Sequence, residues 1–199
     1  MPKPRHNPGR GYREEFRIIA GRWRSRKLHF PSLPGIRPSP DRVRETLFNW
    51  LRDRIEGAAC LDLFAGSGAL GLEALSRGAA HVVFVDQERQ AVDAIRGHLE
   101  LLKAEGGEAI VAEALNWLSG APRPFELVFL DPPFDADLVP EVCARLARGW
   151  LKPGAWIYME HAADQVPALP AGWQVLKESR AGRVGFRLLG VGNQPSSPI

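Results

Sequence analysis

The sequence predicts one α/β domain, with a mostly parallel sheet of about seven strands, helices on both faces and a small basic β-hairpin near the N-terminus. The chain has 199 residues, a length typical of a single domain. Short apolar runs alternate with segments of helical periodicity over residues 59–160, a pattern typical of parallel strands joined by helices. Two more apolar runs follow with no helix between them, so at least one strand should be antiparallel.

The N-terminal part should contain a tail and a hairpin. Residues 1–14 are rich in Pro, Gly and Arg, and we expect a disordered basic tail. Residues 15–36 form an extension in which two short strands, 16–20 and 27–30, flank the basic turn 21–26.

The main domain should occupy residues 37–192, followed by a flexible end at 193–199. It opens with a helix over 41–56, which Ser39 or Asp41 can cap and whose apolar face contains Val43, Leu47, Trp50 and Leu51. The expected strands are 59–63, 81–86, 108–112, 125–130, 154–160, 173–178 and 184–189. The expected helices between them are 68–77, 88–104, 113–119 and 136–149.

The composition indicates an ordinary globular protein, with 45% hydrophobic and 25% charged residues. No apolar run reaches membrane-spanning length, and no apolar segment follows the basic N-terminus as in a secretory signal. Cys60 and Cys143 both lie among apolar residues. We interpret them as reduced core thiols of a cytoplasmic protein, not as a disulfide or a metal site.

Positive charge is concentrated at the N-terminal end. Residues 1–54 hold 14 Lys or Arg against 5 Asp or Glu, whereas the remainder holds 12 against 18. This asymmetry favours a polyanionic partner that docks on one side of the protein, although a solubilising tail is an alternative.

A glycine-rich loop predicts a nucleotide-type cofactor. Gly66, Gly68 and Gly71 have the spacing of a dinucleotide fingerprint between a strand and a helix, and Asp86 ends the next strand. Asp62, at the end of the first strand, would repel a pyrophosphate but would attract the positive amino group of S-adenosylmethionine. We therefore favour S-adenosylmethionine over NAD, with Asp86 on the ribose hydroxyls; a loop without a ligand is the third possibility. The cofactor contacts expected from this loop are Asp62, Phe64, Ala65, Gly66, Ser67, Gly68 and Asp86.

After the third strand, Glu113 or the backbone of Ala114 could contact the adenine, and a plain helix cap is equally consistent with the sequence.

Asp131, Pro132, Pro133 and Phe134 form the most specific motif of the chain. Two consecutive prolines make a stiff corner after the buried strand 125–130, because their φ is fixed and they donate no backbone hydrogen bond. The corner presents a carboxylate, a free carbonyl and an aromatic ring. These groups suit a flat base with an exocyclic amine, although a plain strand-to-helix turn would also use Asp and Pro.

Four stretches, 16–28, 37–51, 61–77 and 131–134, together resemble the bacterial methyltransferases that modify the N2 amine of one loop guanine in small-subunit ribosomal RNA. The resemblance runs from about residue 16 to 189. It implies the class I methyltransferase (Rossmann-like) fold, S-adenosylmethionine as donor and a guanine of 16S ribosomal RNA as acceptor. The chain departs from the family pattern at Pro40, Asp86 and Glu113, and the last of these leaves the adenine contact open.

On this interpretation, Asp131 and the Pro132 carbonyl would accept the two N–H groups of the guanine amine, and Phe134 would stack on the base. The hairpin would bind RNA phosphates, with Trp23 either on a base or packed under the hairpin. Arg42 and Arg44 could line the rim of the site or lie on solvated helix faces. The expected RNA contacts are Arg22, Trp23, Arg24, Arg26, Lys27 and Arg37.

Other functions stay open at this point. A DNA amino-methyltransferase would share the loop and the corner, an NAD-linked oxidoreductase would share the glycines, and an inactive ribosome-assembly factor would share the RNA surface. We expect a monomer acting on RNA, within a small-subunit particle, with no metal and no membrane. His81, His98 and His161 are isolated from one another, so we assign them no catalytic role; His161 is at most a rim contact.

Overall fold

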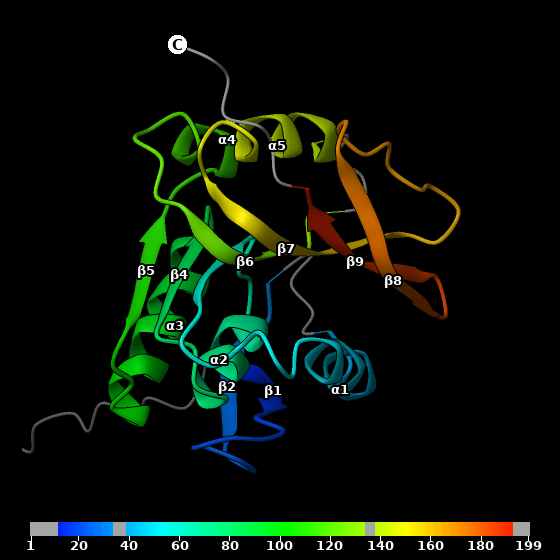
Figure 1. Cartoon of the computed structure of the whole chain (residues 1–199). Helices are drawn as coiled ribbons and strands as arrows, with labels where there is room; N and C mark the ends of the chain where they lie inside the picture. Colours follow the sequence, from blue (N-terminus) through cyan, green and yellow to red (C-terminus); the bar gives the residue numbers. More distant parts are fainter. Residues whose placement is uncertain (1–11, 34–38, 134–137, 193–199) are drawn as a thin grey trace, which may run out of the picture.

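A computed structural model describes residues 12–33, 39–133 and 138–192 and contains two β-sheets (Figure 1). The seven-stranded sheet has the order β5-β4-β3-β6-β7-β9-β8, and β1 and β2 form a separate hairpin. The strands of the seven-stranded sheet are β3 Ala59–Leu63, β4 His81–Asp86, β5 Gly107–Val111, β6 Phe125–Leu130, β7 Leu151–Ala162, β8 Trp173–Ala181 and β9 Val184–Val191. The predicted fold class is confirmed, and β3, β4 and β6 have the predicted bounds.

The sheet is parallel from β5 to β7, and β9 runs antiparallel to both of its neighbours, β7 and β8. This arrangement confirms the expectation that at least one of the last two strands is antiparallel. Because β3 to β7 are parallel, their carboxyl ends all lie at one edge of the sheet. Ligands of open α/β sheets bind at this edge.

Helices cover both faces of the sheet (Figure 1). One face packs against α1 Asp41–Trp50, α2 Ala69–Ser76, α3 Arg89–Leu102 and the hairpin, and the other against α4 Ala114–Trp117 and α5 Val139–Leu146. Alternate residues of each strand enter the two cores: Phe84 and Phe129 point to the α2 side, whereas Val85 and Leu130 point to the α5 side. Cys60 and Cys143 are both buried, as expected, one in each of the two cores.

The hairpin consists of β1 Tyr12–Arg17 and β2 Lys27–Pro31 and shares a core with the main domain. The first strand begins and ends earlier than the predicted range 16–20, so residues 12–14 belong to the hairpin and not to a tail. Phe16, Leu28 and Phe30 are buried in the core that also contains α1, α2 and α3. Residues 1–11 and 193–199, where we expected flexible ends, lie outside the described residues, and so does the expected boundary at 36 and 37.

The first helix is shorter than predicted and has a different start. It ends at Trp50 instead of 56, and its N-cap is Pro40 with no side-chain hydrogen bond. The predicted caps are wrong because both side chains have other partners: Ser39 donates to Glu160, and Asp41 pairs with Arg44. None of the described helices is both long enough and apolar enough to cross a membrane.

Candidate active site

Four carboxylates follow one another along the carboxyl edge of the sheet: Asp86 on β4, Asp62 on β3, Asp131 after β6 and Glu160 on β7. Each lies two positions after a core residue of the α2 face, so strand alternation directs all four to that face. The parallel register pairs Leu130 with Met159, which makes Asp131 and Glu160 neighbours across β6 and β7. The sequence predicted the first three as site residues but not Glu160.

The glycine loop holds two of these carboxylates by its backbone. The Gly71 N–H donates to Asp62 Oδ2 at 2.9 Å, and the Gly66 N–H donates to Asp86 Oδ2 at 2.7 Å. Asp86 Oδ1 accepts a second bond from the Glu88 N–H at 2.8 Å. The loop therefore brings Asp62, Gly66 and Asp86 together, as the sequence predicted.

The geometry of the loop explains its glycines. Gly68 caps α2 with a φ of +76°, a left-handed conformation that L side chains rarely adopt. At Gly71 a Cβ would lie 2.2 Å from a ring carbon of Phe84, so only glycine lets α2 pack this closely on β4. Phe64 has a φ of +82° without being glycine. Such backbone strain, of order 1–3 kcal/mol, is concentrated at functional sites.

Burial raises the pKa of three of these carboxyls, those of Asp62, Asp131 and Glu160. Burial, with a further contribution from Asp86, raises the pKa of Asp62 to about 8, against the lowering effect of the Gly71 N–H. Burial raises the pKa of Asp131 well above its usual range, and the charges of Glu160 and Asp62 add to the effect. Burial also raises the pKa of Glu160, although its bonds from Ser39 and Tyr158 oppose the shift. The edge therefore favours ligands that bring positive charge or N–H donors.

The proline corner follows β6 directly. Asp131 is half-buried, Pro132 is buried and Pro133 is exposed. The corner thus lies at the carboxyl edge of the sheet, where Asp131 is the neighbour of Asp62 and Glu160. Its role in catalysis stays a prediction. Phe134 lies outside the described residues, so its stacking on a base stays a prediction.

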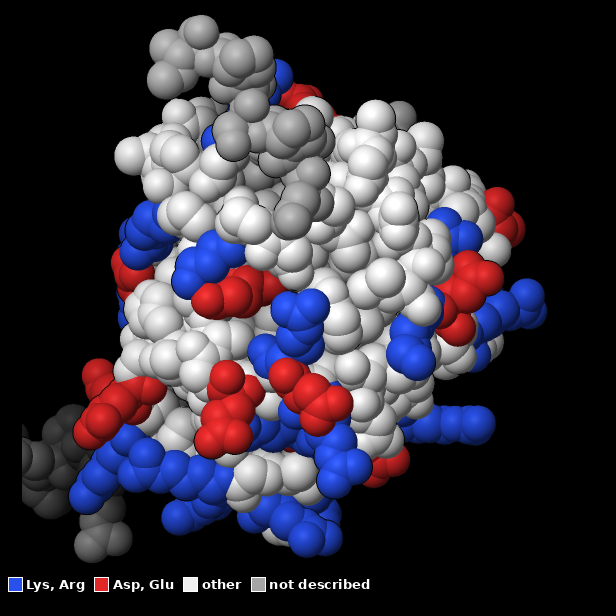
Figure 2. Space-filling view, viewed as in Figure 1, with Lys and Arg blue, Asp and Glu red and all other residues white. Residues whose placement is uncertain are grey.

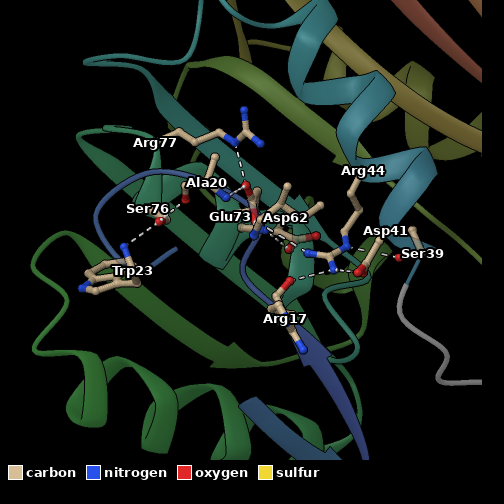
Figure 3. Close-up of polar contacts among 12 residues, drawn as sticks. Arg17, Ala20, Trp23, Ser39, Asp41, Arg44, Asp62, Glu73, Ser76 and Arg77 are labelled. Atoms are coloured by element: carbon tan, nitrogen blue, oxygen red, sulfur yellow. Dashed lines mark hydrogen bonds and ion pairs between the residues drawn. The ribbon is translucent and has the colours of Figure 1, made fainter. Parts of the chain in front are cut away.

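The turn of the hairpin is docked on helix α2 through Glu73 (Figure 3). The Glu73 side chain is fully buried, and its carboxylate accepts the Ile19 N–H at 2.8 Å and the Ala20 N–H at 3.0 Å. It also accepts the Arg77 Nε–H at 2.6 Å, and Arg44 Nη1 lies 3.7 Å away. One buried acid thus attaches the hairpin to α2, the helix that begins in the glycine loop.

Ser76 provides a second attachment at the end of the same helix. Its hydroxyl donates to the Ala20 carbonyl at 2.6 Å and accepts the Trp23 N–H at 3.0 Å (Figure 3). Its carbonyl accepts the Arg22 N–H at 2.7 Å. Gly21, with a φ of +82°, has no room for a side chain, because a Cβ would lie 1.8 Å from the Ser76 carbonyl oxygen. The turn is therefore held in a fixed place.

Comparison with known proteins agrees with this geometry. The profile of the family described as "Conserved hypothetical protein 95" matches residues 16–190. This chain belongs to that family.

Its relatives include the Escherichia coli (strain K12) "Ribosomal RNA small subunit methyltransferase D", 45% identical over 94% of each chain. The Haemophilus influenzae protein of the same name is 44% identical over 87% of this chain and 93% of its own. A solved structure of the Escherichia coli protein yhhF matches with a TM-score of 0.83 and 44% identity, covering 91% of this chain and 100% of that one. The expectation of a class I methyltransferase with S-adenosylmethionine as donor is thereby confirmed at the level of the family.

In this family member, the basic side chains of the hairpin turn are exposed. Arg22, Arg24, Arg26 and Lys27 are all exposed, and Lys27 is paired with Glu15 at 2.8 Å. Figure 2 shows Lys and Arg side chains gathered along its lower edge, below Asp and Glu side chains; the hairpin lies at this edge in Figure 1. Arg42 is also exposed, whereas Arg37 lies outside the described residues.

Two basic-region expectations need correction. The Trp23 side chain is 9% exposed and belongs to the core, so packing under the hairpin is the observed arrangement, not an exposed stacking platform. Arg44 is neither a rim residue nor a solvated one. Its side chain is fully buried, where it pairs with Asp41 at 2.5 Å and donates to the Arg17 carbonyl at 2.9 Å (Figure 3).

Glu113 forms the helix cap that the sequence left as one of two options. Its carboxylate accepts the Leu115 N–H at 3.0 Å and the Asn116 N–H at 2.8 Å, so both oxygens are engaged by the start of α4. A contact between the adenine and the backbone of Ala114 stays a prediction.

Two of the histidines are buried and hydrogen-bonded to backbone carbonyl groups. His98 is buried with Nε2 2.9 Å from the His29 carbonyl oxygen, and His161 is buried with Nδ1 2.8 Å from the Ala162 carbonyl oxygen. A rim contact was the most that the sequence allowed for His161, and its ring is buried. Over residues 12–33, 39–133 and 138–192, no group of three or more His, Cys, Asp or Glu side chains is arranged to hold a metal ion.

Proposed function

We propose that this protein transfers a methyl group from S-adenosylmethionine to the exocyclic N2 amine of a guanine in small-subunit ribosomal RNA. The observation that carries the proposal is the position of Asp131. It lies at a rigid proline corner, beside Asp62 and one strand away from the glycine loop, in a chain 45% identical to a ribosomal RNA methyltransferase.

The donor would lie along the carboxylate row. Asp86 would accept hydrogen bonds from the ribose hydroxyls, and Asp62 would pair with the positive amino group of the methionine part. Gly66 and Gly68 let the backbone approach this part closely. The high pKa of Asp62 supports this assignment, because a buried carboxyl short of positive charge is stabilised in its ionised form by a bound ammonium group.

The acceptor amine would be held at the proline corner. The Asp131 carboxylate and the Pro132 carbonyl would accept its two N–H groups, which localises the nitrogen lone pair and directs it at the methyl carbon. A bond then forms between N2 and that carbon as the carbon–sulfur bond breaks, and S-adenosylhomocysteine leaves. The positively charged nitrogen finally loses one proton, which Asp131 or water can accept.

RNA would dock on the basic turn of the hairpin. Arg22, Arg24 and Arg26 are exposed, while Glu73 and Ser76 fix the turn on α2. A fixed basic turn orients the RNA backbone relative to the site, since phosphate contacts set register and not sequence. The target guanine must be in a loop or flipped out, because its amine is inaccessible in a stacked helix.

Removing charge from the turn tests this docking surface. Replacing Arg22, Arg24 and Arg26 with Ala should weaken RNA binding and reduce the slope of log affinity against log salt by about one for each lost phosphate contact. Filter binding at several salt concentrations measures it, with Arg96→Ala as a control, because Arg96 lies on α3 and is paired with Asp93. An unchanged slope would relocate the RNA-binding surface.

Methylation itself is tested with purified protein, labelled S-adenosylmethionine and three substrates: naked 16S ribosomal RNA, small-subunit particles and duplex DNA. Mass spectrometry of the nucleosides should find N2-methylguanosine. The rate of methyl transfer to naked RNA, compared with the rate on small-subunit particles, identifies which of the two is the better substrate. A product on DNA, or on another base, would contradict the proposal. The monomeric state, the absence of a metal and the cytoplasmic location are parts of this proposal that sedimentation, a chelator control and cell fractionation can test.

A further inference from the structure

Glu160 is a buried acid at the active edge that the methyl-transfer step above does not use. It lies near the end of β7 and is 4% exposed. Its Oε1 accepts a hydrogen bond from the Tyr158 hydroxyl at 2.7 Å and another from the Ser39 hydroxyl at 2.5 Å. Two donors from two different segments therefore fix the orientation of this carboxyl.

The second oxygen of Glu160 has a different environment. Within the described part of the chain, both hydrogen bonds of this carboxyl end on Oε1 and none on Oε2. Among the described residues, no basic side chain lowers the pKa of Glu160 or of Asp131. A carboxyl held by one oxygen leaves the other oxygen to accept an N–H from a ligand.

Glu160 is also the neighbour of the acid proposed to hold the acceptor amine. Asp131 and Glu160 are one residue beyond the paired positions Leu130 and Met159 on adjacent strands, about 4.8 Å apart. The charge of Glu160 acts directly on Asp131. The carboxyl groups of Asp131 and Glu160 are thus neighbouring acceptors. Glu160 lies on the side of Asp131 away from the glycine loop, because β7 and β3 flank β6 on opposite sides.

The Watson–Crick edge of guanine matches two neighbouring acceptors. It presents the N1–H donor next to the N2 amine, whereas adenine and cytosine present a lone pair at the ring nitrogen beside their amine. An ionised carboxylate can only accept hydrogen bonds, so it attracts the guanine edge and repels the other two.

We propose that Glu160 selects guanine by accepting its N1–H, while Asp131 and the Pro132 carbonyl hold the N2 amine. This inference rests on the proposed function and adds a specificity-determining residue to it. Tyr158 and Ser39 are positioning residues, because they hold Glu160 without contacting the base.

The test uses a synthetic RNA stem–loop that the wild-type protein methylates, and the same RNA with 2-aminopurine at the target position. 2-Aminopurine keeps the N2 amine but has a lone pair in place of the N1–H. Wild-type protein should prefer guanine by about 10- to 100-fold in kcat/KM, the value of a hydrogen bond to a charged group. Equal rates on the two RNAs would overturn the inference without any variant.

The informative variant is Glu160→Gln, which keeps the size of the side chain. Its amide oxygen can accept the Tyr158 and Ser39 hydroxyls, and its NH₂ then donates where the carboxylate accepted. The rate on guanine should fall by about 10- to 100-fold, and the preference for guanine over 2-aminopurine should disappear or reverse. A merely structural role would lower both rates equally and leave the ratio unchanged, which would contradict the inference.

Two controls separate the possible failures. Glu178→Gln removes an exposed acid of β8 that pairs with Arg187, and it should leave the ratio at the wild-type value. The methyl position in the wild-type product on guanine RNA tests the proposed function independently. A methyl group elsewhere than N2 rejects that function, whereas a methyl group on N2 with an unchanged ratio in Glu160→Gln rejects only the role of Glu160.

Discussion

Two clusters of charged residues have opposite surroundings: the hairpin cluster, formed by Glu73 with Arg44 and Arg77, and the acids at the edge of the sheet. Glu73 on α2 accepts two backbone N–H groups and the Arg77 guanidinium, and Arg44 lies 3.7 Å away. The acids at the sheet edge, Asp131 and Glu160, instead face one another with no cation among the described residues.

The contrast distinguishes a structural acid from an acid that awaits a ligand. A buried charge with complete partners costs little to keep and fixes the position of what it binds, here the hairpin turn. Buried acids without a neighbouring cation resist ionisation, so a ligand with positive charge or N–H donors stabilises their ionised form when it binds. Substitutions in the two clusters should therefore have opposite consequences for stability and activity.

The largest effect on stability should come from Glu73→Gln. The change removes the buried negative charge next to Arg44 and Arg77, and the fully buried Arg44 keeps only Asp41 as an acidic partner. This loss should lower the free energy of unfolding by about 3–5 kcal/mol. Denaturant titration measures the loss, and amide hydrogen exchange at Ile19 and Ala20 should accelerate. The matched control is Glu100→Gln on the exposed side of α3, for which about 0.5 kcal/mol or less is expected.

A stability loss in Glu73→Gln as small as in the control would mean that the hairpin is held by its apolar core contacts alone. Accelerated hydrogen exchange confined to residues 18–23, with exchange in the sheet unchanged, would be a more specific result. It would show that the cluster holds the hairpin and not the whole domain.

At the sheet edge, Asp131→Ala should abolish most activity and spare the fold. Loss of one preorganised group that acts on the reacting amine typically lowers kcat by about 10²–10³-fold. Binding of S-adenosylmethionine, measured by calorimetry, should change little, because Asp131 contacts the acceptor and not the donor. Since burial and the charge of Glu160 oppose ionisation of Asp131, the variant should be at least as stable as wild type near neutral pH. Near-normal turnover would refute the role proposed for Asp131.

The sequence predicted the acids of the edge better than those of the hairpin cluster, for a physical reason. Asp62, Asp86 and Asp131 each come at a strand end beside glycine or proline, where the local sequence restricts the backbone. Glu73 lies in the apolar run 69–76 of a helix, and the backbone N–H groups that it binds, those of Ile19 and Ala20, are more than 50 residues away in the chain. Its role depends on tertiary contacts. A single acid in an otherwise uncharged helix nevertheless indicates a buried, paired carboxylate.

The same reason explains why the sequence left Trp23 open between two arrangements, misplaced Arg44 and gave no role to Glu160. A tryptophan between arginines suggests a nucleic-acid contact, but the docking of the turn on Ser76 places Trp23 in the core. Arg44 has the sequence context of a surface helix residue, yet the hairpin covers it. Glu160 is two residues after Tyr158 in a buried strand, and this alternation becomes informative only once the register with β6 is known.

The smallest expected effect is the pH dependence of donor binding, which follows from Asp62. Its pKa of about 8 in the free protein means that the carboxyl is protonated at pH 6–7, and a bound ammonium group requires the ionised form. The affinity for S-adenosylmethionine should therefore rise up to about tenfold per pH unit between pH 6 and 7, with release of about one proton. The rise should end near pH 8, where Asp62 is ionised and α-amino groups, with a pKa of about 7.7–8.0, begin to lose their proton.

Calorimetry in two buffers with different ionisation enthalpies counts the released proton. Asp62→Asn should bind the donor more weakly and without this pH dependence, because its amide does not titrate. The sign of the stability effect gives an independent check. The folded protein holds a proton on Asp62 that the unfolded chain loses near pH 4, so the free energy of unfolding should fall as the pH rises from about 4 to 8. If the affinity did not change between pH 6 and 7 while the stability fell as expected, Asp62 would be a buried acid that the donor does not contact, and its amino group would be held elsewhere on the edge.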